Sequence, residues 1–186
     1  MLDIKQKDNR SITHTFTGEK ITFLETSKET NGAFEYIEVF LPPGGEGPGL
    51  HYHMNFKESF EVIDGELKIL YGKEEKVLQI GETLHVAKGE HHTFLNASNE
   101  KAVTFRVKIT PANQFEESMR ILYGLMEDGK TDNKGLPKDK IHGALILDMQ
   151  DTRLVKMPFL IKILLNHLVK KGKKKGIDKE LLRRYT

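Results

Sequence analysis

The sequence predicts an all-β sandwich or barrel followed by an α-helical C-terminal extension. Residues 11–110 divide into short segments rich in β-branched and aromatic residues, separated by turn signals. After the Thr110-Pro111 dipeptide, apolar residues recur at helical spacing instead. A chain of 186 residues is long enough to bury a core without disulfides, so we expect one domain with an appendage.

Nine strands are predicted within residues 11–110. Many short antiparallel strands with small loops favour an architecture that closes or hides its sheet edges. In the third strand, Tyr36 and Phe40 lie on the opposite face from Ile37. Asp64-Gly65 is a strong signal for a two-residue hairpin. The predicted strands are 11–17, 20–25, 33–41, 58–63, 66–71, 76–80, 83–86, 92–95 and 102–109.

Helices are predicted for the rest of the chain. Residues 112–128 form the first, with Asn113 as its cap and apolar residues at helical spacing: Phe115, Met119, Leu122 and Met126. Residues 138–149 form the second, and a third begins at Pro158. The last ten residues add one or two turns. We therefore divide the chain into a β-barrel, residues 1–110, and a helical extension with a basic tail, residues 111–186.

The amino-acid composition indicates which cellular compartment to expect. The chain has no cysteine, which excludes disulfides and thiolate metal sites and fits a reducing environment. The first 16 residues are polar and charged with no apolar core, so no signal peptide is expected. No stretch reaches the roughly 18 apolar residues of a membrane span. A cytoplasmic location is the expectation.

The charge is unevenly distributed. Residues 151–186 carry 11 Lys and Arg against 3 Asp and Glu, a net of +8, and the remaining 18 against 24 give −6 for residues 1–150. A basic amphipathic helix after Pro158 suits peripheral contact with an anionic membrane. The alternative is a helix packed on the barrel or on a second subunit, followed by a solvated lysine run. Nucleic acid is not expected, because the lysines lack interleaved aromatic residues.

Four residues point to a metal site: His51, His53, Glu58 and His92. Imidazole and carboxylate are usual ligands of borderline divalent metals. Positions i and i+2 of a strand point the same way, so His51 and His53 share one face. Three imidazoles and one carboxylate leave two positions on a six-coordinate ion for water, substrate or dioxygen.

These residues fall in two motifs that resemble those of the cupin superfamily. The first is Gly45-x5-His51-x-His53-x4-Glu58-x6-Gly65, and the second is Gly81-x5-Ala87-x-Gly89-x2-His92-x3-Asn96. The one departure is Ala87, where the family usually has proline. The resemblance covers roughly residues 34–109. It implies a double-stranded β-helix, or jelly-roll barrel, similar to small single-domain cupins of the quercetin-dioxygenase type.

The resemblance also implies a site and a function. His51, His53, Glu58 and His92 would bind one divalent metal inside the barrel, where Glu58 would also be catalytic by taking a proton from the substrate. The alternative for Glu58 is a purely structural ligand role. The nitrogen and oxygen donors do not select among Fe, Mn, Ni, Zn, Cu and Co. The candidate pocket-lining residues are Tyr36, Phe40, Met54, Phe60, Phe94 and Phe105, for which ordinary core packing is the alternative.

The expected function is that of a metal-dependent, oxygenase-type enzyme acting on a small organic molecule. The alternatives are a non-catalytic cupin that binds or senses a small molecule, and a metal-dependent sugar isomerase or epimerase. The resemblance implies a homodimer. His91 is not expected to be a ligand, because adjacent strand residues face opposite ways and the spacing favours His92. His85 lies in the strand before the turn of the second motif and is expected at the surface or the pocket rim.

Overall fold

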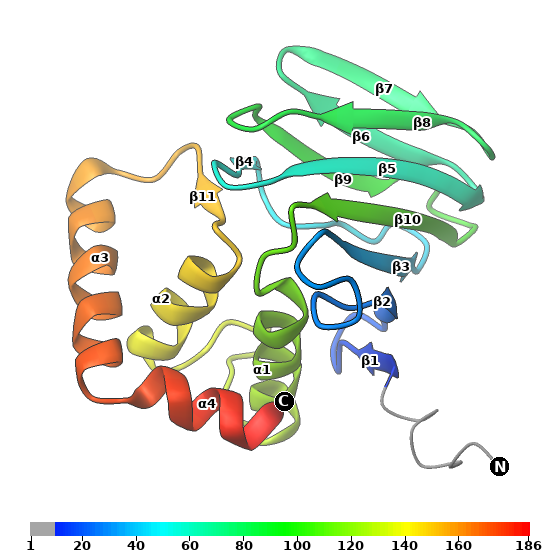
Figure 1. Cartoon of the computed structure of the whole chain (residues 1–186). Coiled ribbons are helices and arrows are strands. Elements are labelled where there is room, and N and C mark those ends of the chain that lie inside the picture. The colour runs from blue at the N-terminus through cyan, green and yellow to red at the C-terminus, as the bar shows by residue number, and fades with distance from the viewer. Residues whose placement is uncertain (1–9) are drawn as a thin grey trace, which may run out of the picture.

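Two antiparallel sheets and a group of helices make up the computed structural model, which describes residues 10–186 (Figure 1). The expectation of no signal peptide concerns a segment that includes residues 1–9, which lie outside the described residues. The strands before Pro111 are β1 (Ser11–Thr13), β2 (Lys20–Glu25), β3 (Glu35–Leu41), β4 (His51–Tyr52), β5 (Lys57–Asp64), β6 (Leu67–Tyr71), β7 (Glu74–Leu78), β8 (Thr83–Val86), β9 (His92–Asn96) and β10 (Val103–Thr110). They are followed by α1 (Phe115–Glu127), α2 (Lys140–Met149), β11 (Arg153–Leu154), α3 (Phe159–Lys174) and α4 (Ile177–Tyr185).

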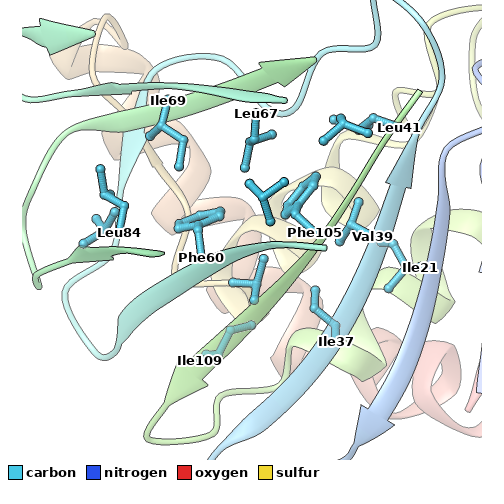
Figure 2. Close-up of a cluster of buried hydrophobic side chains, with 14 of the residues drawn as sticks. Ile21, Ile37, Val39, Leu41, Phe60, Leu67, Ile69, Leu84, Phe105 and Ile109 are labelled. Atoms are coloured by element: carbon cyan, nitrogen blue, oxygen red, sulfur yellow. The ribbon is translucent and has the colours of Figure 1, made fainter. Parts of the chain in front are cut away.

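The sheets pack face to face as a jelly roll. Sheet A has the strand order β1-β2-β3-β10-β5-β8, and sheet B has the order β11-β4-β9-β6-β7. The predicted fold, a jelly-roll barrel with a helical extension, is confirmed. Alternation along β3 and β10 turns Ile37, Val39, Phe105 and Val107 inward. Figure 2 shows these two strands contributing to a core that also takes Phe60 from β5 and Leu67 and Ile69 from β6.

The predicted strands agree with the structure in most places. The bounds of β2 and β8 are as predicted, whereas β1 ends at Thr13 and β7 begins two residues early, directly after the turn at Gly72. The hairpin expected at Asp64-Gly65 is wrong, because β5 belongs to sheet A and β6 to sheet B. Gly65 instead turns the chain between sheets. Its φ is +78°, and an added Cβ would lie 2.5 Å from Ala102 O.

The first helix of the extension packs against the barrel core. Tyr123 and Met126 of α1 join the barrel core, while Ile121 of the same helix belongs to a second core shared with α2 and α4. Asn113 does not cap α1 as predicted: the N-cap is Gln114, and the Asn113 side chain donates a hydrogen bond to Met149 O at 2.5 Å. The final segment forms a nine-residue helix, α4, rather than one or two turns.

α3 lies at the outer edge of the molecule and packs chiefly against α2 (Figure 1). Of the helices within residues 10–186, none combines the length and apolar character needed to cross a bilayer.

The extension also supplies a strand to the barrel. Arg153 and Leu154 of β11 pair with Tyr52 and His51 of β4, and Val155 N donates to Leu50 O at 3.1 Å. No strand was expected from the sequence at β11. The contact places residues 151–155 of the extension beside the segment that carries His51 and His53.

Candidate metal centre

Both sheets contribute to the site. His51 opens β4 and His92 opens β9, and these two residues face each other across the antiparallel ladder of sheet B. His53 follows β4 directly, on the same face as His51. Glu58 comes from β5 of sheet A, so its carboxylate reaches the imidazoles from the opposite wall.

The four side chains converge at one point in the interior. One ligand atom from each lies within 4.8 Å of the other three, and all four residues are buried. Glu58 Oε2 is 2.8 Å from His92 Nε2 and 3.7 Å from His53 Nε2. Neither Glu58 Oε2 nor His92 Nε2 has a hydrogen-bond partner of acceptable geometry among the described residues. Buried polar atoms are nearly always satisfied, so this donor set fits a cation at their centre.

The outward nitrogens of the three imidazoles all contact main-chain carbonyls. His51 Nδ1 lies 2.9 Å from Gly49 O, His53 Nδ1 lies 3.1 Å from Asp151 O, and His92 Nδ1 lies 3.1 Å from Glu90 O. A carbonyl oxygen only accepts, so each Nδ1 carries the proton and each Nε2 keeps its lone pair. This arrangement orients three neutral nitrogen ligands toward the cluster.

The electrostatics favour the metal-binding forms of His51, His53 and Glu58. Burial, together with the neighbouring His92 and His53, lowers the pKa of His51 to about 4. Burial likewise lowers the pKa of His53. Burial alone would raise the pKa of Glu58, but the surrounding imidazoles lower it overall. Burial opposes a charge on His92, yet the adjacent Glu58 carboxylate raises the pKa of that imidazole. The carboxylate is therefore the stable anion of the cluster.

The family follows from the sequence around this cluster. Residues 37–108, which include all four side chains, match the family model described as the cupin domain. The match assigns residues 37–108 of the chain to the cupin superfamily.

Solved cupin structures resemble part of the chain. A predicted oxalate decarboxylase from Thermotoga maritima is 22% identical, with 50% of this chain and 80% of that chain covered and a TM-score of 0.46. An RmlC-like cupin from Shewanella frigidimarina is 20% identical, with 56% and 86% covered and a TM-score of 0.48. A sugar phosphate isomerase of the cupin superfamily from Silicibacter pomeroyi is 26% identical, with 50% and 59% covered and a TM-score of 0.44. A search of curated proteins finds no match. With TM-scores below 0.5, the family assignment rests on the sequence match.

The aromatic residues proposed to line the cupin pocket separate into two groups. Phe60, Phe94 and Phe105 lie in the interior near the cluster, with Phe60 and His92 ring centroids 6.2 Å apart. Tyr36 and Phe40 lie on the outer face of β3, where the Tyr36 hydroxyl donates to Glu61 Oε2 at 3.4 Å and Phe40 is 40% exposed. The proposal for Tyr36 and Phe40 is therefore corrected.

Met54, the sixth candidate, is 46% exposed. It lies over the turn at Gly89, whose added Cβ would be 3.7 Å from Met54 Sδ. The structure thus places Met54 at the surface beside the cluster rather than inside the barrel.

The other histidines of the cupin motifs lie outside the cluster. His91 is exposed and its ring centroid is 5.2 Å from that of Tyr52. His85 is exposed, and its Nδ1 is 2.8 Å from Ser59 Oγ. Neither belongs to the group of four proposed ligands, and for His91 alternation along the strand predicts this.

Two residues near the site were not found from the sequence. Phe56 stacks on His53, with ring centroids 4.3 Å apart and planes at 26°. Asp151 is buried and accepts hydrogen bonds at Oδ2 from Met54 N at 2.6 Å and Asn55 N at 2.7 Å. Its φ of +47° is unusual for a residue other than glycine. That Phe56 lies between two predicted ligands was the only sequence signal for either residue.

Proposed function

We propose that His51, His53, Glu58 and His92 bind one divalent metal ion and that the protein is a metal-dependent enzyme of the oxygenase type, acting on a small organic molecule. The observation that carries the proposal is the convergence of three Nε2 lone pairs and one carboxylate at a buried point. A binding function without metal would not need three imidazoles held in one tautomer by separate carbonyls.

The bound ion would supply Lewis acidity and, for a redox-active metal, electron transfer. The chain's own residues would hold the ion and position the substrate. Four donors leave two positions on a six-coordinate ion, so a small organic anion or dioxygen fits beside the protein ligands. Phe60 and Phe94, whose ring centroids are 5.7 Å apart, form an apolar wall next to the cluster. Such a wall excludes water and strengthens the electrostatic interactions at the centre.

Glu58 is the proposed catalytic residue. It is the one carboxylate of the cluster, and it projects from the sheet opposite the two strands that begin with His51 and His92. A carboxylate with neutral imidazoles around it can accept a proton from a substrate bound at the same centre. A ligand role alone is the competing assignment. A pH profile of turnover for Glu58→Asp, which keeps the carboxylate and shortens the side chain, separates the two.

The remaining proposals concern organisation and location. We propose residues 1–110 as the barrel and residues 111–186 as the extension, with β11 as the part of the extension that enters a barrel sheet. A homodimer is proposed from the family resemblance. A cytoplasmic location is proposed from the absence of cysteine.

Metal content tests the site directly. Protein purified without chelator or histidine tag is analysed for elements as wild type, as His51→Ala/His92→Ala, and as His85→Ala/His91→Ala. The last variant is the matched control, since it removes two exposed histidines. We expect about one metal per chain in the wild type and the control, and none in the first variant. Equal metal in all three, or none in any, would overturn the proposed site.

The identity of the metal then tests the reaction class. Iron, manganese, nickel or copper supports the oxygenase proposal and is followed by oxygen uptake over a panel of small organic acids, phenols and diketones. Zinc shifts the assignment to an isomerase or epimerase, which needs no oxygen. A stoichiometric metal without turnover of any compound favours a binding or sensing role.

A further inference from the structure

The first half of α3 exposes a cluster of large apolar side chains. Phe159 and Leu160 are 74% and 76% exposed, and Ile161, Ile163 and Leu164 are between 43% and 50% exposed. Apolar side chains scattered singly over a surface need no explanation, but a contiguous group of this size marks an interaction site. We call these five residues the apolar end of α3.

The second half of the same helix is basic, as is its C-cap residue, Lys175. Lys170, Lys171, Lys174 and Lys175 are exposed, and residues 152–177 contain eight Lys and Arg without a single Asp or Glu. Of these eight cations, Arg153 and Lys173 are the two that pair with a carboxylate among the described residues. The rest of the charge is not neutralised by the body of the protein.

The packing of α3 fixes which side faces outward. Gly172 is buried against α2, where an added Cβ would lie 2.8 Å from Ile141. Lys162, Leu165 and Asn166 line a cavity of about 300 Å³ between α3 and the α2–β11 segment. Leu160, Leu164 and Lys171 lie on the opposite side by helical spacing. By this spacing, apolar and basic side chains share one outward stripe of α3. The helix itself lies at the edge of the molecule (Figure 1).

We propose that this stripe binds the surface of an anionic lipid bilayer, with the apolar end of α3 inserted among the acyl chains and the four lysines at the headgroups. An amphipathic helix with these two components is suited to lie in the membrane interface. The proposal does not depend on the metal or on the reaction.

Two other partners would each match only one part of the stripe, either its lysines or its apolar end. Nucleic acid offers phosphates to the lysines but no apolar phase for five exposed side chains. A second copy would cover the apolar end, but a twofold contact would add another segment of the same positive charge to the same face. An anionic lipid surface satisfies both halves.

The test measures binding of the full-length protein to vesicles by co-sedimentation. Vesicles of phosphatidylcholine alone are compared with vesicles containing about 30% phosphatidylserine, at low and high salt. We expect binding to the anionic vesicles only, weakened by salt. Replacing Lys170, Lys171, Lys174 and Lys175 with Gln should lower the apparent affinity by roughly 100-fold or more, from the contribution of each lysine near such a surface. Phe159→Ser/Leu160→Ser should abolish binding.

Matched control variants exist on the barrel. Val77→Ser/Ile80→Ser removes two exposed apolar side chains, 42% and 63% exposed, from the β7 region. Changing Lys20, Lys73, Lys88 and Lys101 to Gln removes four exposed barrel lysines and changes the net charge equally. Both controls should bind vesicles as the wild type does.

The proposal is overturned if wild-type protein ignores anionic vesicles at low salt, or if both lysine variants lose affinity equally. Sedimentation analysis of Phe159→Ser/Leu160→Ser tests whether a second copy of the chain binds the stripe instead of a membrane. A wild-type dimer that this variant converts to monomer, with no vesicle binding by either, would assign the stripe to contact between copies.

Discussion

The Nδ1 nitrogen of His53 lies 3.1 Å from the main-chain oxygen of Asp151, a residue 98 positions later in the chain. The Asp151 Oδ2 atom accepts hydrogen bonds from the two amides that follow His53, and its Oδ1 atom pairs with Arg153 Nη2 at 3.2 Å. The helical extension therefore supports a proposed metal ligand from outside the family motifs. Partners of this kind fix the orientation of a ligating imidazole.

Asp151→Ala should weaken metal binding. The substitution removes the acceptor of Met54 N and Asn55 N and leaves a residue that disfavours φ +47°. We expect a loss of affinity of roughly 10- to 100-fold in a metal titration. Asp151→Asn keeps an oxygen acceptor and tolerates the backbone conformation, so its loss should be smaller. Nitrogen NMR of the His53 ring should show mixed tautomers in Asp151→Ala. An unchanged affinity in that variant would remove Asp151 from the site.

Removing the metal should lower thermal stability. A ligand that binds only the folded state stabilises it by about 2.7 kcal/mol when its concentration is 100 times Kd. A chelator should therefore lower the Tm of the wild type and of His91→Ala, and excess metal should restore it. His92→Ala should show no response to either treatment. If chelator lowers the Tm of His92→Ala as much as that of the wild type, the stabilising ion lies elsewhere.

Glu35 should make stability fall as pH rises. The side chain is 1% exposed, neither carboxyl oxygen has a hydrogen-bond partner of acceptable geometry within residues 10–186, and burial with the nearby Glu117 raises its pKa to about 8. Between the unfolded pKa of 4.5 and about 8, the unfolded chain has released this proton and the folded chain has not. The stabilisation that the neutral carboxyl gives the folded state is thus complete below pH 4.5 and is lost as the pH rises toward 8.

The variant Glu35→Gln stays neutral throughout this range. By linkage, its free energy of unfolding should match the wild type near pH 5 and exceed it by up to about 5 kcal/mol near pH 8. Urea unfolding of both proteins at several pH values gives the difference, in which other titrating groups cancel. A difference that does not vary with pH would show that Glu35 is already ionised in the folded protein.

The four proposed ligands could be predicted because they fall within two short sequence motifs, and because two of them lie on one pair of neighbouring strands. His51 and His92 face each other in the ladder, and alternation together with the motif spacing excludes His91 from the cluster. Tyr36 and Phe40 could not be placed this way. Both faces of β3 carry apolar or aromatic residues, so a period of two identifies two faces without showing which is interior.

Contacts between distant parts of the chain left no sequence pattern. β11 has two residues, too few for any periodicity, and Asp151 is separated from His53 along the chain by several strands and by α1 and α2. The dipeptide Asp64-Gly65 did signal a turn, with Gly65 at φ +78°, but a local signal does not say which sheet the next strand joins. Tertiary packing decided these features.

Gly172 and Gly143 offer a matched test of how α3 is held. In a helix interior, Ala is favoured over Gly by up to about 1 kcal/mol. Gly143 of α2 has nothing within 4 Å of an added Cβ, so Gly143→Ala should stabilise the protein by about that amount. At Gly172 the same Cβ would lie 2.8 Å from Ile141 Cγ2 and 3.0 Å from Leu145 Cδ1. Overpacking costs about 1–3 kcal/mol. This cost outweighs the gain in helix propensity, so Gly172→Ala should destabilise the protein. Urea unfolding of the two variants gives the sign of each change. Equal stabilisation by both would mean that α3 does not dock on α2 through Gly172.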